Sequence, residues 1–271
     1  MRVPASIVLA LRRSSSPRPT ARRIPFDSAA VSSCHDDDDG RSLKRAMAEQ
    51  PIEWRSDIEL LLGQNVVRNW LSSSDVDDVA LARYPGEWKF IGGATEPVDA
   101  GDLERTAKRE LTEELLLETQ AELDAVEKLT MRPFGVKRTR AVRGVAHNMH
   151  SFIALEDDQA DDDIFGLVFN VEKANERLAA RRRAHAVAVA DRSFFAQSRE
   201  ERMQLSPEVH EVAFHPLDVA AHDALTSLIR PMRPVNAYQA KEYKFYGVAE
   251  RDPMYQTLRI VLDLEREFGA S

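Results

Sequence analysis

From residue 51 onward the chain alternates short apolar runs, which are typical of strands, with longer segments of helical period. We expect strands at residues 79–82, 88–91, 131–142, 149–155 and 209–214, and helices at residues 103–117, 217–229 and 254–265. The first two strands are joined by the turn Pro85-Gly86-Glu87 and fit a hairpin. Strands that alternate with helices predict an α/β fold in which helices pack on a mixed sheet.

A long polar segment lies between the last two of these strands. Residues 156–206 are predicted to form an insertion, and residues 170–202 within it are helix-prone and strongly charged. This part contains the basic run Arg181-Arg182-Arg183. On a long polar helix such a run is typical of a solvated face, and contact with a phosphate or with RNA is the alternative.

The first 46 residues differ in composition from the rest of the chain. Residues 1–26 contain six arginines, no Asp or Glu, and a stretch rich in Ser, Pro and Thr, which is the composition of an organelle transit peptide. We therefore predict that residues 1–46 are a disordered extension that directs the protein to the mitochondrion, and that residues 47–271 form the folded domain. A tail without a targeting role, on a cytoplasmic protein, is one alternative. Secretion is another, although the apolar piece Ala5–Leu11 is short for a signal peptide.

The overall charge limits the classes of partner. Lys and Arg number 37 against 45 Asp and Glu, a net charge of −8, and residues 47–271 alone carry 28 against 40, a net charge of −12. An acidic surface does not favour nucleic acid or an anionic membrane. The single cysteine, Cys34, excludes an intramolecular disulfide and a zinc site built mainly on thiolates. No apolar run approaches the roughly 18 residues of a bilayer span, so no membrane partner is expected.

Three glutamates on the predicted helix at residues 103–117 carry the strongest chemical signal. Glu110, Glu113 and Glu114 are spaced i, i+3 and i+4 and therefore share one face. At about 100° per residue, Glu110 and Glu114 fall beside the apolar stripe of that helix. Partly buried carboxylates that lie close together are costly unless a cation neutralises them, and hard divalent ions do this well. The alternative is a solvated acidic face of a surface helix.

The residues around this cluster resemble a known motif. Residues 88–117 are similar to the Nudix box, written as Gly, five residues, Glu, seven residues, then Arg-Glu-apolar-x-Glu-Glu-x-Gly-apolar on a strand, a loop and a helix. Arg109-Glu110-Leu111-Thr112-Glu113-Glu114 matches the central hexad at every defined position. Residues 206–218 are similar to a late strand of the same family, so the resemblance covers most of residues 75–229.

The sequence departs from this pattern at four places. Sixteen positions separate Gly93 from Arg109, where the pattern has fourteen, so the loop is two residues longer. The first Glu of the pattern is missing, and Asp99 or Asp102 could replace it as the carboxylate that pairs with Arg109. Leu116 stands at the position of the last glycine, and the proline often found before the double glycine is Ile91.

The resemblance implies a Nudix-type α/β/α sandwich with a mixed sheet, a helical insertion and a C-terminal helix. It also implies hydrolysis, with Mg²⁺ or alternatively Mn²⁺, of a nucleoside diphosphate linked to another group, such as ADP-ribose, NADH or coenzyme A. Glu113 and Glu114 would be the main metal ligands, with the Gly93 carbonyl as a backbone ligand, and Glu110 would be a further ligand or the base. Further downstream, Glu211 is the preferred ligand or base and Glu208 the alternate. Arg109 would orient the loop.

Two other functions are compatible with the same residues. One is a non-catalytic Nudix-like scaffold in an organellar ribosome or an RNA-processing assembly, and the other is removal of phosphates from RNA 5′ ends. The acidic charge favours a small nucleoside-diphosphate partner over a long RNA. The strand after the box helix could point basic side chains at a diphosphate, and it offers Lys137, Arg138, Arg140 and Arg143.

Overall fold

A seven-stranded mixed sheet forms the centre of the computed structural model, which describes residues 2–14, 22–23, 53–71, 79–82, 85–138, 146–229 and 253–269. The main path of the sheet runs in the order β11 (Val209–Pro216), β4 (Ile58–Asn65), β1 (Arg2–Arg13), β10 (Ala146–Leu155) and β9 (Arg132–Arg138). Two short strands extend it, with β7 (Trp88–Lys89) paired to β4 and β8 (Ile91–Ala94) paired to β1. Strands β1 and β10 are parallel and the other pairs are antiparallel, which confirms the predicted mixed sheet.

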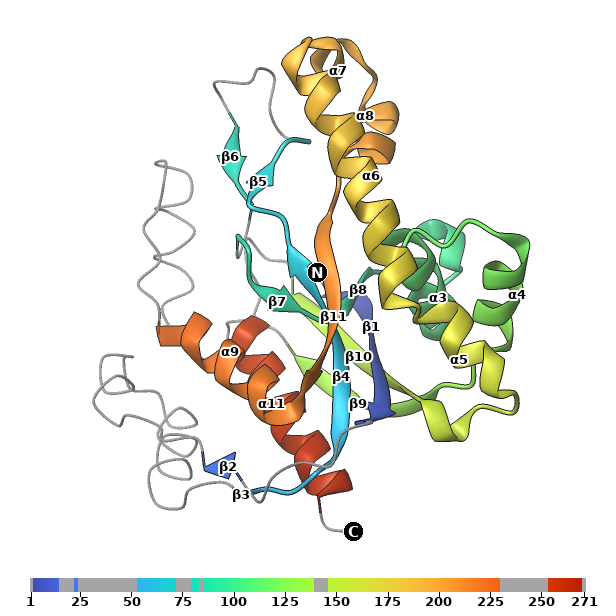
Figure 1. The fold of residues 1–271 in the computed structure, drawn as a ribbon, viewed down its shortest axis with the longest axis vertical. Coiled ribbons are helices and arrows are strands. Elements are labelled where there is room, and N and C mark those ends of the chain that lie inside the picture. The colour runs from blue at the N-terminus through green and yellow to red at the C-terminus, as the bar shows by residue number, and fades with distance from the viewer. Residues whose placement is uncertain are drawn as a thin grey trace.

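Helices cover both faces of the sheet (Figure 1). On one face, α3 (Leu103–Glu114), α4 (Gln120–Lys128), α5 (Asp162–Val168) and α6 (Val171–Ala190) bury a core that includes Val8, Leu61 and Leu111. On the other face, α9 (Leu217–Ile229) and α11 (Pro253–Phe268) bury a second core that includes Leu9, Leu60 and Leu258. The predicted α/β/α arrangement and the predicted C-terminal helix are confirmed.

The N-terminal segment is the main correction to the sequence-based prediction. Residues 2–13 are not a disordered extension but the central strand β1, in register with β10 from Arg2 opposite Ala146 to Leu11 opposite Leu155. Its side chains alternate between the two cores, so the strand is buried on both faces and its sequence is almost continuously apolar. In the sequence alone, an apolar run of this length next to arginines is also compatible with a leader. Most of residues 15–46 lies outside the described residues, and mitochondrial targeting stays a prediction.

The predicted hairpin between residues 79–82 and 88–91 is wrong. Strand β6 (Ala80–Leu81) pairs with β5 (Arg68–Asn69), in a separate two-stranded sheet, whereas β7 joins β4 of the main sheet. The turn at Gly86 is present, but the strand that follows it pairs with Gly63 and Gln64 of β4 and not with β6.

Residues 156–206 are helical, as expected, and are closely attached to the rest of the domain. They form α5, α6, α7 (Ser193–Ala196) and α8 (Arg199–Leu205) after a short 3₁₀ turn. Glu122 of α4 is 1% exposed and accepts an ion pair of 2.6 Å from Lys173 Nζ and one of 3.0 Å from Arg177 Nη2, both on α6. Arg177 Nη1 also donates to the Leu116 carbonyl at the end of α3. The long helix is thereby fixed against the helix that carries the glutamate cluster.

Candidate functional site

The predicted strand, loop and helix at residues 88–117 are all present. Strand β8 lies against β1, and a Cβ at Gly92 would collide with the Ser6 carbonyl oxygen, so only glycine fits there. Ser6 is fully buried in β1 and donates a hydrogen bond of 2.7 Å to the Leu103 carbonyl at the start of α3. The N-terminal strand thus supports both the glycine loop and the helix of the site.

The end of this helix shows why the box pattern has glycine there. Helix α3 ends at Glu114, shorter than the predicted limit of about residue 117, and Leu116 has a φ of 52°. This is the left-handed region that glycine adopts freely and other residues adopt at a cost of roughly 1 kcal/mol. Leu116 keeps this conformation while packing against the core of the α3 face.

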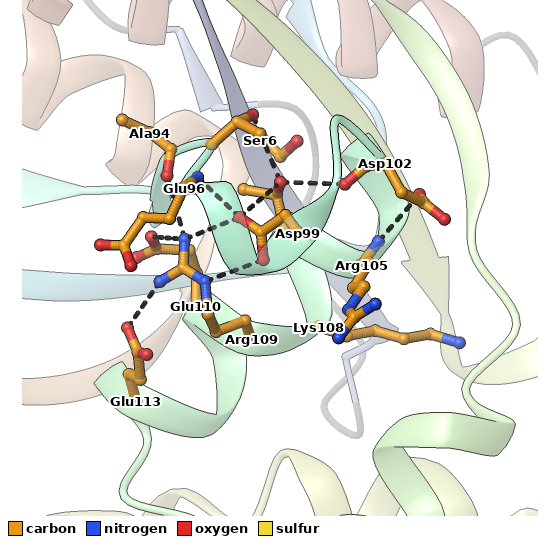
Figure 2. Close-up of polar contacts among 12 residues, drawn as sticks. Ser6, Ala94, Glu96, Asp99, Asp102, Arg105, Lys108, Arg109, Glu110 and Glu113 are labelled. Carbon is orange, nitrogen blue, oxygen red and sulfur yellow. Dashed lines mark hydrogen bonds and ion pairs between the residues drawn. The ribbon is translucent and has the colours of Figure 1, made fainter.

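Arg109 and Asp99 hold the longer loop in place (Figure 2). Asp99, 1% exposed in a 3₁₀ turn, accepts hydrogen bonds of 3.0 and 3.1 Å from Arg109 and one of 3.0 Å from Thr106 Oγ1. Arg109 hydrogen bonds lower the pKa of Asp99 to about 2. Asp102 instead caps α3, accepting from the backbone N–H groups of Glu104 and Arg105. Of the two candidates, Asp99 is therefore the carboxylate that pairs with Arg109.

A pair of conservative substitutions tests this assignment. Asp99→Asn removes the charge that faces Arg109 and should lower the free energy of unfolding at neutral pH by about 3 kcal/mol. Asp102→Asn should change the free energy of unfolding by only a few tenths of a kcal/mol, because Asn caps helices as well as Asp does. The lowered pKa of Asp99 stabilises the fold above the unfolded pKa of about 4 and stops doing so as the pH falls towards 2, so the two variants should converge in acid. Urea unfolding at several pH values measures this, and equal losses in both variants at pH 7 would contradict it.

The three glutamates of the box occupy different environments. Glu110 and Glu114 are 9% and 5% exposed, which rules out a solvated face for these two, whereas the side chain of Glu113 is 56% exposed. Glu110 lies against Gly93 so closely that a Cβ there would be 2.5 Å from its Oε1 atom. The structure therefore brings Gly93 and Glu110 together, as the box predicts.

Two cations of the protein neutralise part of this cluster. Arg109 contacts Glu110 Oε1 at 2.9 Å and Glu113 Oε2 at 2.8 Å, and Lys89 Nζ contacts Glu114 Oε1 at 2.7 Å. Glu114 Oε2 also accepts a hydrogen bond of 3.0 Å from the Gly92 N–H. The sequence pattern alone does not point to Lys89. The feature of the sequence that could have indicated Lys89 is its position two residues before Ile91-Gly92-Gly93.

The surroundings of Glu110 and Lys89 shift the pKa values of both groups upward. Burial, together with repulsion from Glu114, raises the pKa of Glu110 to about 7 even though Arg109 is in contact with it. Burial lowers the pKa of Lys89, but its contact with Glu114 more than offsets this and the net shift is upward. For Glu110, burial is the larger of the two causes, and the charge of the neighbouring Glu114 adds to it.

A cavity of about 440 Å³ opens beside these residues. It is bordered by acidic side chains from the loop, from α3 and from the segment before β11, and by residues of α6 and α8. The acidic residues that line it are Glu96, Glu113, Glu114, Glu118 and Glu208. A larger groove of about 770 Å³ runs between α3 and α4, but neither Glu113 nor Glu114 lines it, and Glu110 lines neither this groove nor the smaller cavity.

The downstream glutamate in this cavity is Glu208 and not Glu211, which reverses the predicted preference. A bulge between Val209 and Glu211 lets Val209 and Val212 both face the core of the α3 side. Glu211 is exposed, and its negative charge partly opposes the lowering of the His215 pKa by burial. Glu211 is therefore not placed to act as a metal ligand or base with Glu113 and Glu114.

The donor set suits a hard divalent cation by charge and by chemistry. The carboxylates Glu110, Glu113, Glu114 and Glu208 outnumber Lys89 and Arg109, and Arg109 also serves Asp99. All the donors are oxygens, as Mg²⁺ and Mn²⁺ prefer. Within the described ranges, no three Asp, Glu, His or Cys side chains form a ready-made metal-binding group. A bound cation would therefore compete with Lys89 for Glu114 and with Arg109 for Glu113.

Of the basic residues predicted to point at a diphosphate, Lys137 is the one whose side chain the structure describes, and it is engaged away from this cavity. Lys137 of β9 makes an ion pair of 2.6 Å with Asp263 of α11, in the opposite helical layer. The side chain of Arg138 and all of Arg140 and Arg143 lie outside the described residues. In contrast, Arg181 lines the cavity, and Arg182 donates to the His210 carbonyl, so neither is part of a purely solvated run.

Comparisons with known proteins gave only weak similarities. No protein-family model matches the sequence, and no curated protein is significantly similar to it. The solved structures that resemble it include the Nudix domain of Shewanella oneidensis NrtR complexed with ADP-ribose (13% identical, TM-score 0.34, covering 90% of this chain and 89% of that one). Another is a Nudix hydrolase from Alicyclobacillus acidocaldarius, which is 12% identical with a TM-score of 0.38 over 90% of this chain and 95% of that one. A third is a MutT/Nudix family protein from Listeria innocua, which is 13% identical with a TM-score of 0.33 over 90% of this chain and 96% of that one.

Similarity at this level does not assign a function. In the described part of the chain, no helix combines the length and apolar character that crossing a bilayer requires.

Proposed function

We propose that the protein is a Nudix-type hydrolase that uses Mg²⁺, or alternatively Mn²⁺, to cleave a nucleoside diphosphate linked to another group. The observation that carries this proposal is the excess of carboxylates, two of them buried, on the box helix beside a cavity of about 440 Å³. A structural role does not require buried like charges, because apolar residues of similar size would stabilise the fold at least as well. The match of Arg109–Glu114 to the box hexad supports the same conclusion.

The residues of the chain have distinct tasks in this reaction. Glu113 and Glu114 would hold the cation, with Glu110 and Glu208 as further candidates. When bound, a divalent cation would screen the repulsion between these carboxylates and the substrate's diphosphate and would stabilise charge on the leaving phosphate. Glu110, buried on the same helix and lying against Gly93, is the candidate to accept the proton of the attacking water. Arg109 orients the loop through Asp99 and the Ala94 carbonyl.

Turnover of a substrate panel tests this proposal. We expect the purified full chain with Mg²⁺ to hydrolyse at least one member of a set containing ADP-ribose, NADH, coenzyme A, dinucleoside polyphosphates and 5′-triphosphorylated or capped RNA. Phosphate and nucleotide products would be followed by chromatography, and EDTA should abolish the reaction. Absence of turnover of every member with either Mg²⁺ or Mn²⁺ would refute the enzymatic function.

One observation favours the alternative of a non-catalytic Nudix-like scaffold. Glu110, Glu113 and Glu114 each already have a cation of the protein as a partner, so the cluster is partly neutralised without a metal. A scaffold would show no turnover and no response to Mg²⁺. RNA 5′-end hydrolysis, in turn, would be favoured if activity rose with RNA length while the small substrates stayed inert.

A further inference from the structure

Arg181 is a basic residue that faces the acidic cavity from the helical segment 156–206. It lies on α6 and lines the same cavity as Glu113, Glu114 and Glu208. Met203 of α8 lines the cavity beside it. Helices α6 and α8 therefore form a wall opposite the box helix.

The hydrogen-bonding capacity of Arg181 is largely unused. Its Nη2 atom donates to the Met203 carbonyl at 2.6 Å, and its Nε atom is buried without an acceptor. Among the residues that the structure describes, no carboxylate lies within ion-pair distance of it. Arg177, one turn earlier on the same helix, is instead fully engaged with Glu122 and the Leu116 carbonyl.

Burial of this kind is costly for a cation that lacks a partner. It lowers the pKa of Arg181, although the charges of Glu208 and Glu118 oppose the shift. A guanidinium with open donors is suited to a phosphate, because its planar fork matches two phosphate oxygens at once. Such a contact would neutralise the charge of Arg181.

The rest of the cavity explains why a cation is needed on this wall. A diphosphate that enters it meets a border of carboxylates, and the cations of the box, Lys89 and Arg109, are already paired with Glu110, Glu113 and Glu114. The volume of about 440 Å³ is within the range of small-molecule sites, and Met203, which is 44% exposed, adds apolar surface for an uncharged part of the ligand.

We propose that Arg181 binds phosphoryl oxygens of a small nucleoside diphosphate and so makes the segment 156–206 part of the substrate site. That this ligand is the enzyme's substrate rests on the proposed function. That Arg181 binds a diphosphate does not depend on the proposed function.

Binding of α,β-methylene-ADP, whose P–C–P bridge cannot be hydrolysed, tests the proposal by titration calorimetry with Mg²⁺. Arg181→Met should weaken binding at least about tenfold, and Arg181→Lys should recover part of the loss. Arg183→Met, an exposed site two residues along the same helix that does not line the cavity, is the matched control and should bind like the wild type. If Arg181→Met unfolds, Arg181→Gln keeps a donor for the Met203 carbonyl and takes its place.

The outcomes separate this inference from the proposed function. Equal affinity of the position 181 variants and Arg183→Met, or no binding by the wild type, would overturn the role of Arg181. If the wild type bound the analogue through Arg181 but hydrolysed no substrate of the panel, Arg181 would stand as a diphosphate-binding residue and the hydrolase function would fall. In an active enzyme, Arg181→Met should raise KM far more than it lowers kcat.

Discussion

Leu9→Asp in the full chain should yield no folded protein. Leu9 is 0% exposed in the centre of β1 and packs in the core beneath α9 and α11. The substitution removes a buried leucine side chain, which costs about 2–5 kcal/mol, and places a carboxylate in an apolar core at a further cost of several kcal/mol. Together these losses approach the whole stability of a typical domain, about 5–15 kcal/mol.

Circular dichroism and thermal unfolding measure the effect, with Val136→Asp as the control. Val136 lies on β9 and is 50% exposed, so the same acidic substitution in a strand should cost less than about 1 kcal/mol there. A chain lacking residues 1–13 should fail to fold for the same reason as Leu9→Asp. A folded, stable Leu9→Asp protein would show that residues 2–13 are an extension, as the composition first indicated.

Glu113→Gln and Glu114→Gln should each reduce turnover at least about 100-fold, more than loss of an outer-shell residue usually costs. The stabilities of the two variants should differ. Glu113 is exposed, so its loss should leave the free energy of unfolding within about 1 kcal/mol of the wild type. Glu114 is buried against Lys89, so its loss leaves that ammonium without its partner and should destabilise the protein measurably.

Glu104→Gln is the matched control for these variants, because it makes the same change on the same helix, where Glu104 pairs with Lys108. It should retain full activity. Steady-state rates on the best substrate of the panel, measured beside melting temperatures, separate a loss of chemistry from a loss of fold. Equal activity of Glu113→Gln and Glu104→Gln would show that the box carboxylates do not take part in the reaction.

The box could be predicted from sequence because its signal is local. The spacing of Glu110, Glu113 and Glu114 and the apolar stripe beside them follow from helix geometry alone. The choice between Asp99 and Asp102 needed the structure, although Asp102 stood at the N-cap position, where side chains normally serve the backbone. Because Asp102 caps α3, Asp99 is the one of the two that pairs with Arg109.

Three features could not be predicted because they depend on contacts distant in sequence. Strand β1 reads as an apolar leader until β10, from more than 100 residues away, pairs with it and helices cover both faces. The bulge at Val209 reverses which side of the sheet Glu211 faces, and no residue type there signals it. Arg181 belongs to the site only because α6 packs against the end of α3 through Arg177.

The central claim is that the face formed by Glu110, Glu113 and Glu114 binds a divalent cation, and direct Mn²⁺ binding tests it most simply. Mn²⁺ would be titrated into the metal-free wild type, Glu104→Gln and the double variant Glu113→Gln/Glu114→Gln, with free Mn²⁺ followed by electron paramagnetic resonance. We predict saturable binding by the wild type and by Glu104→Gln, and an affinity at least about tenfold lower in the double variant. Equal binding by all three proteins would contradict the claim.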